Sequence, residues 1–126
     1  MLSDSQVVAT IPVRDANRAK AFYHDTLGLT QMEERPGAVS YKSGGFTLFI
    51  YESDQAGTNK GTAATWITSD VDGAVKELKD RGVAFERYDS LPGLAMKGDI
   101  HVGGDGAVKI AWFKDPDGNI LSIMNA

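Results

Sequence analysis

The sequence predicts an α+β fold made of two βαβββ modules, whose strands form a curved mixed sheet, a U-shaped cup, with the helices on its outer face. The main observation is an internal repeat: "ATIPVRDANRAKAFYHDTLGLT" (residues 9–30) matches "ATWITSDVDGAVKELKDRGVA" (64–84). The modules also end alike, with "GGFTLFIY" (44–51) and "DGNILSIM" (117–124). A chain of 126 residues is long enough for one domain with a buried core. We expect module 1 at about residues 5–52, a linker at 53–62 and module 2 at about 63–126.

Each module is expected to open with a strand and a helix. Asp15 and Asp70 lie where an N-cap is needed, because an Asp carboxylate accepts hydrogen bonds from the free N–H groups of the first helical turn. Apolar residues then recur at helical spacing, and Gly28 and Gly82 suit a left-handed helix end. Further strands are expected near residues 30–35, 38–42 and 44–51 in module 1, and near 84–88, 107–114 and 120–124 in module 2.

Two connecting segments are predicted to differ in structure, one a tight turn and the other an irregular loop. "DPDG" (115–118) predicts a hairpin turn, because Pro116 presets φ and Gly118 accepts a positive φ. "LPGLAMKGDIHVGGDG" (91–106) is long and glycine-rich, and is expected to be an irregular, mobile loop or lid.

Composition argues against several classes of partner and site. The net charge is −4 and the pI is about 5.0, which disfavours nucleic-acid binding because a phosphate-binding surface needs clustered Lys and Arg. The chain has no cysteine, so disulfides, thiolate metal sites and a Cys nucleophile are excluded. Neither a signal peptide nor a membrane span is evident. The expectation is a cytoplasmic protein with no membrane partner.

Strand alternation separates the two faces of the predicted sheet. The helix side takes the fully apolar positions, such as Ile11 and Val13 on the first strand and Leu121 and Ile123 on the last. The other side carries aromatic and aliphatic groups with a few hydroxyls and no charge, which is typical of a small-molecule pocket. Its predicted members include Thr10, Phe49 and Tyr51 in module 1, and Thr65 and Ser122 in module 2.

Three segments resemble the vicinal oxygen chelate superfamily, which includes glyoxalase I, extradiol dioxygenases, fosfomycin-resistance enzymes and bleomycin-resistance proteins. They are "IPVRDANRAKAFYHDTLGL", "SDVDGAVKELKDRGV" and "IAWFKDPDGNILSI", and together they cover nearly the whole chain. The resemblance implies paired βαβββ modules around a cup. It also implies a homodimer.

The resemblance implies four metal-ligand positions, two in each module. They fall on Val8 and Phe49 in module 1 and on Ala63 and Ser122 in module 2. Val8, Phe49 and Ala63 have no ligand atom, and the Ser122 hydroxyl is a poor ligand for a divalent cation. The sequence therefore resembles metal-free members that bind a compound without transforming it. No metal, cofactor or catalytic residue is assigned.

Each candidate ligand-binding residue has a structural alternative. The Ser122 hydroxyl is expected either to hydrogen-bond a ligand or to leave room for it. Phe49 and Tyr51 suit stacking on a planar ligand, or serve as hydrophobic filler or a subunit interface. Trp112 is expected on the cup face, although its register is open, and Trp66 on the helix side.

Two histidines complete the candidates. His101 lies two residues after Asp99, so in an extended segment the two side chains point the same way and suit acid–base or ligand-orienting chemistry. The alternative for His101 is an exposed loop residue. His24 is expected at the surface of the first helix.

Three functions remain open. The leading one is metal-free binding of a small apolar or aromatic molecule, as in drug sequestration or resistance. The second is a lyase, isomerase or dioxygenase with an atypical metal site near His101. The third is a dimeric interaction module without a ligand.

Overall fold

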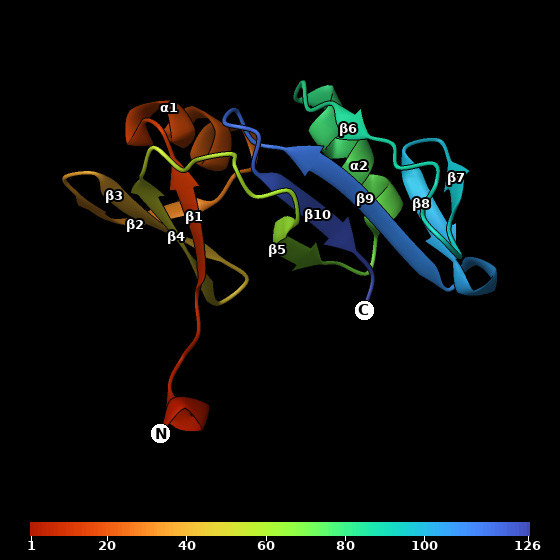
Figure 1. Ribbon diagram of the computed structural model, residues 1–126, viewed down its shortest axis with the longest axis horizontal. Coiled ribbons are helices and arrows are strands. Elements are labelled where there is room, and N and C mark those ends of the chain that lie inside the picture. The colour runs from red at the N-terminus through yellow and green to blue at the C-terminus, as the bar shows by residue number, and fades with distance from the viewer. The chain divides into compact units, whose positions relative to one another are not determined.

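The computed structural model describes all 126 residues and has the predicted α+β fold with two βαβββ modules (Figure 1). The strands of each module form a sheet of their own. The chain divides into two compact units, which are described separately. Unit 1 comprises Met1–Asn59 and Pro116–Asn119, and unit 2 comprises Lys60–Asp115 and Ile120–Ala126. No helix is long and apolar enough to cross a membrane.

Unit 1 contains a four-stranded sheet in the order β1-β4-β3-β2. β1 runs parallel to β4, and the other neighbours are antiparallel. Its elements are η1 (Leu2–Asp4), β1 (Ala9–Val13), α1 (Ala16–Lys20), η2 (Ala21–Thr26), β2 (Thr30–Arg35), β3 (Ala38–Ser43) and β4 (Phe46–Glu52).

The first helix begins as predicted and continues in a wider form. The Asp15 carboxylate accepts hydrogen bonds from the N–H groups of Asn17 and Arg18, at 2.8 and 3.2 Å. After α1 the helix becomes the π-helical turn η2, whose widening the apolar spacing did not predict. Leu27 N–H donates to the Phe22 carbonyl, five residues earlier, at 2.9 Å. Gly28 then adopts the expected left-handed conformation, with φ +78°.

Unit 2 contains a sheet in the order β5-β10-β9-β8-β7, with β6 pairing with β9. β10 runs parallel to β5 and antiparallel to β9. Its elements are β5 (Thr62–Ile67), α2 (Val71–Asp80), β6 (Phe85–Glu86), β7 (Ala95–Lys97), β8 (Ile100–Gly103), η3 (Gly104–Gly106), β9 (Val108–Lys114) and β10 (Ile120–Met124).

One face of the unit 2 sheet forms its core. Helix α2 contacts β9 and β10 and begins at Asp70, whose carboxylate accepts from Gly73 N–H at 2.9 Å. Alternation puts the buried apolar residues of β9 and β10 on one face, and they are Ala111, Phe113, Leu121 and Ile123. Trp66 lies on this side as predicted, with its ring 6.3 Å from that of Phe113.

The prediction of an irregular loop at 91–106 is wrong. The segment contains the antiparallel hairpin of β7 and β8, joined by a two-residue turn at Gly98 and Asp99. Gly98 has φ +64°, as the first central residue of a type II′ turn requires. Gly93, Gly98, Gly104 and Gly106 adopt positive φ where the chain turns, and Gly103 ends strand β8.

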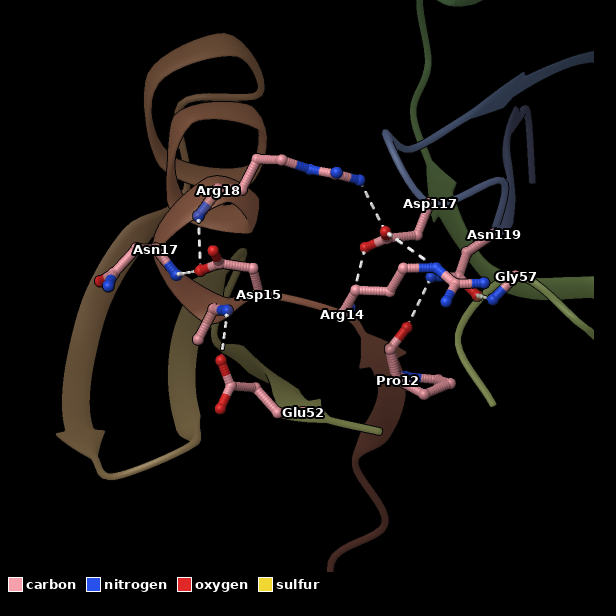
Figure 2. A network of polar contacts seen from close by, with 10 residues as sticks. Pro12, Arg14, Asp15, Asn17, Arg18, Glu52, Gly57, Asp117 and Asn119 are labelled. Carbon is pink, nitrogen blue, oxygen red and sulfur yellow. Dashed lines mark hydrogen bonds and ion pairs between the residues drawn. The ribbon is translucent and has the colours of Figure 1, made fainter. Parts of the chain in front are cut away.

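The predicted hairpin turn before β10 also anchors unit 1 (Figure 2). Asn119 donates from Nδ2 to the Pro12 carbonyl at 2.7 Å and accepts at Oδ1 from Gly57 N–H at 3.1 Å. The Asp117 carboxylate accepts from Arg14 N–H at 3.1 Å and from the Arg18 guanidinium at 2.6 Å. These bonds fasten β1, α1 and the segment after β4 to the same four residues.

A Gly57→Ala substitution tests this close packing. Gly57 has φ +73°, and an added Cβ would collide with the Asp117 carbonyl oxygen. Gly45→Ala is the matched control, since Gly45 has φ +84° with nothing within 4 Å of an added Cβ. We expect about 1 kcal/mol of lost stability for Gly45→Ala and about 3 kcal/mol for Gly57→Ala in urea denaturation. Equal losses would contradict the packing at Gly57.

Candidate functional site

The helix-free face of the unit 2 sheet carries a pair of hydroxyl groups. β10 places Ser122 opposite Thr65 of β5 and Trp112 of β9. The Ser122 and Thr65 hydroxyl oxygens are 2.7 Å apart, so one donates a hydrogen bond to the other. The Ser122 side chain is buried and that of Thr65 is exposed. The hydrogen bond therefore joins a buried hydroxyl to an exposed one on this face.

Trp112 lies on the same face, and its indole is fixed in place. Its Nε1–H donates to the Thr62 hydroxyl at 3.1 Å. The ring packs 5.3 Å from Tyr88 and 4.7 Å from His101, both in edge-to-face geometry. We call Tyr88, His101 and Trp112 the aromatic cluster. Edge-to-face contacts of this kind are a preferred and stabilising geometry, so the cluster presents an ordered apolar surface beside the hydroxyl pair.

The prediction that His101 belongs to a loop is wrong. His101 lies on β8 with 0 % exposure, paired with Ile110 of β9. Its Nε2 accepts a hydrogen bond from Tyr88 N–H at 2.9 Å, and its Nδ1 is buried without a partner. The structural alternative for His101, an exposed loop residue, is wrong for the same reason.

The structure does not bring Asp99 and His101 together. Asp99 lies in the turn before β8, where strand alternation does not apply, and its carboxylate accepts from Lys79 at 2.7 Å and Arg87 at 3.1 Å. The hydrogen bond from Lys79, followed by that from Arg87, lowers the Asp99 pKa. Asp99 lines a depression of about 310 Å³ beside α2. It is therefore part of an ion-pair cluster, with no hydrogen bond to His101.

The helix-free face of unit 1 contains the other predicted residues. Phe49 lies opposite Thr10 of β1 and Ser40 of β3, and Tyr51 lies opposite Pro12. The side chains of Phe49 and Tyr51 are half-buried. This face therefore offers aromatic surface with hydroxyl groups, as alternation predicted.

His24 has a local structural contact. Its Nδ1 donates to the Leu29 carbonyl at 2.7 Å, which satisfies a backbone group just past the π-helical turn. The side chain is partly exposed, as predicted.

The positions that the resemblance implies for a metal do not fit one. In unit 1, Val8 and Phe49 have no ligand atom. In unit 2, Ala63 has none, and the Ser122 hydroxyl is already bonded to Thr65. No three His, Asp or Glu side chains lie close enough to hold a metal ion together. We therefore derive no chemistry through a metal at these positions.

Sequence reasoning missed Tyr88 and Thr62. Tyr88 follows the short strand β6, and its side chain is half-buried. Burial, followed by the Glu86 carboxylate, raises the Tyr88 pKa, so its hydroxyl stays neutral at physiological pH. Its aromatic character was visible in the sequence, but its contact with Trp112 depends on β6 pairing with β9. No local pattern signals that pairing.

The sequence matches one family over almost its whole length. Residues 5–123 match the family model for the Glyoxalase/Bleomycin resistance protein/Dioxygenase superfamily. This chain belongs to that superfamily. No curated protein matches the sequence.

Solved structures of superfamily proteins share the fold. TnmS3, an antibiotic binding protein from Streptomyces sp. CB03234, is 26% identical, with a TM-score of 0.68 over 96% of this chain and 95% of that one. A glyoxalase family protein from Enterococcus faecalis is 20% identical, with a TM-score of 0.72 over 98% and 99%. Lactoylglutathione lyase from Agrobacterium tumefaciens is 18% identical, with a TM-score of 0.71 over 98% and 94%. The last two likenesses show the fold alone.

The lowered pKa of Asp99 gives a pH test of the ion-pair cluster. A depressed folded-state pKa contributes stability that is present above the unfolded pKa of about 3.9 and is lost as the pH falls through the folded value. We therefore expect Asp99→Asn to be less stable than the wild type at pH 7, with the difference shrinking below about pH 4. Urea denaturation across this pH range measures the difference in stability.

Asp80→Asn, which breaks an exposed pair with Lys76, is the control and should change stability little at any pH. A difference that stays constant with pH would contradict the ion pairing of Asp99.

Proposed function

We propose that this superfamily member binds a small apolar or aromatic molecule, without a metal, on the helix-free face of the unit 2 sheet. The observation that carries the proposal is the aromatic cluster beside the Ser122–Thr65 hydroxyl pair. Small-molecule sites typically combine apolar and aromatic walls with a few placed polar groups. The lack of ligand atoms at Ala63 supports metal-free binding.

Hydrogen bonding on this face favours a guest recognised by shape. The Trp112 indole N–H donates to the Thr62 hydroxyl, and the Ser122 and Thr65 hydroxyls are hydrogen-bonded to each other. An apolar guest that covers these groups would leave none of them without a hydrogen-bond partner. Binding would therefore avoid the free-energy cost of burying an unpaired polar atom. The exposed Thr65 hydroxyl keeps further bonding capacity for one polar atom of the guest.

The unit 1 face is a second candidate for contact with the same class of compound. Phe49 and Tyr51 offer ring surface and Thr10 offers a hydroxyl. TnmS3, the 26% identical relative, is an antibiotic binding protein. We therefore propose an antibiotic or an aromatic metabolite as the guest, and sequestration or resistance as the role.

The two tryptophans allow a direct test, because they lie on opposite faces of one sheet. The probes are proflavine, a planar cation, and 8-anilinonaphthalene-1-sulfonate, an anion. Two-dimensional ¹H–¹⁵N NMR follows the two indole N–H signals, assigned with Trp66→Phe and Trp112→Phe. We expect a probe to shift the Trp112 signal, and Trp112→Ala to weaken binding about tenfold while Trp66→Phe leaves it nearly unchanged. Shifts confined to Trp66, or no shift with either probe, would contradict the proposal.

We also propose that the chain forms a homodimer. The exposed apolar side chains near the N-terminus, Leu2 at 80 % and Val7 at 88 % exposure, support this, as does β1 as an edge strand. Sedimentation velocity over about a hundredfold concentration range should show a monomer–dimer equilibrium. Val7→Lys should shift it toward monomer, and Lys60→Ala, a change at another exposed position, should not. A monomer throughout would contradict the dimer.

A further inference from the structure

The His101 side chain links β8 to residues 87–94, a segment with few other main-chain hydrogen bonds. Residues 87–94 contain no strand, and the backbone bonds at Leu91 N–H and Leu94 N–H are local and long, at 3.3 and 3.4 Å. The bond from Tyr88 N–H to His101 Nε2 is shorter, at 2.9 Å, and spans 13 residues. The imidazole therefore takes the place of a backbone acceptor for this segment.

The bond fixes the protonation state of the ring. A main-chain N–H can only donate, so Nε2 must present its lone pair to Tyr88, and the proton of the neutral ring lies on Nδ1. Nδ1 is buried and has no partner. A second proton would have to go to Nε2, where it would face the Tyr88 N–H as a second donor.

The surroundings offer no compensation for a charged ring. The carboxylates on the neighbouring elements are bonded to Lys or Arg, in the pairs Glu86–Lys114, Asp99–Lys79, Asp99–Arg87 and Asp72–Lys109. The remaining charged groups nearby in sequence, Asp89, Lys97 and Asp105, are exposed. The groups that pack directly on His101 are the rings of Tyr88 and Trp112. A buried cation without a partner is strongly unfavourable, so protonation must be accompanied by local opening.

We propose that His101 is a positioning residue, whose neutral form holds Tyr88 and Trp112 in place and whose protonation releases them. Histidine is the side chain that ordinarily changes charge between pH 5 and 8. The helix-free face of unit 2 is thus preformed at neutral pH and loosened in mild acid. The consequence for ligand binding rests on the function proposed above, whereas the opening of residues 87–94 does not.

The test compares three proteins between pH 8 and 5.5. His101→Gln keeps an acceptor that cannot take up a proton in this range. His24→Gln is the matched control, because the chain has two histidines and this variant replaces the other one. The readouts in ligand-free protein are the hydrogen-exchange protection factor of the Tyr88 amide and the Trp112 indole signal. Binding of 8-anilinonaphthalene-1-sulfonate is measured in parallel.

We expect the protection factor of Tyr88 to fall about tenfold or more in the wild type and in His24→Gln as the pH is lowered, and to stay level in His101→Gln. Affinity for the dye should fall in the first two proteins only as far as the open form becomes populated, by about twofold when half of the protein is open, and should stay level in the third. A transition that persists in His101→Gln, or that disappears in His24→Gln, would overturn the proposal.

Two further outcomes keep the inference separate from the proposed function. If the Tyr88 transition occurs but the dye binds at no pH, the role of His101 stands and the proposed binding fails. If His101→Gln does not fold, the ¹⁵N shifts of the His101 ring in the wild type decide. A neutral ring protonated on Nδ1 at pH 8 supports the proposal, and one protonated on Nε2 overturns it.

Discussion

The side-chain amide of Asn119 is the constraint on which the packing of unit 1 depends. It satisfies the Pro12 carbonyl on the edge strand β1 and the Gly57 N–H at the same time. Asn119 is buried, and a buried backbone group left without a partner would cost about as much as a lost hydrogen bond. These bonds belong to the four residues, Pro116–Asn119, that unit 1 takes from the later part of the chain. Asp117, with its side chain only 3 % exposed, reinforces this through Arg14 and Arg18.

A bulge at the start of β10 sets the register of this strand against β5. Ile120 pairs with Thr62 but Leu121 pairs with Ala64, so β5 contributes one extra residue, Ala63, at this point. Without the bulge Ser122 would lie opposite Ala64. With it Ser122 lies opposite Thr65, and the two hydroxyls come within 2.7 Å. A one-residue difference in register reverses which side chains share a face, so the hydroxyl pair exists because of this irregularity.

The fold was predictable because it rests on local signals repeated in both modules. The caps at Asp15 and Asp70 and the alternation along β1, β4 and β10 each follow from the chemistry of a few neighbouring residues. The same alternation placed Phe49 and Ser122 on the helix-free faces. The position of Trp112 required its pairing with Ser122, which no local pattern supplies.

The failures have a common cause, which is that tertiary contacts overrode local composition. Five glycines in the segment 91–106 suggested mobility, yet two short strands form around Gly98. His101 was assigned to that loop, and its burial follows from β8 pairing with β9 and from the cover supplied by Tyr88. Tyr88 itself carries no periodic signal, because β6 is only two residues long. Its role depends on partners far along the chain.

For the function proposed above, these features account for selectivity without a metal ion. Where the resemblance implies ligands for a cation, unit 2 has Ala63 in a bulge and a Ser122 hydroxyl already paired with Thr65. The Ser122 and Thr65 hydroxyls are bonded to each other and the Trp112 N–H to Thr62, so these groups help to set the shape of the surface, and the exposed Thr65 hydroxyl keeps capacity for one further bond. Trp112 is held on one side by Thr62 and on the other by His101 and Tyr88. A rigid ring costs little entropy when a guest binds to it. In the proposed function, discrimination among guests depends on fit to a preformed aromatic surface, and the His101–Tyr88 bond contributes to it by holding that surface in place.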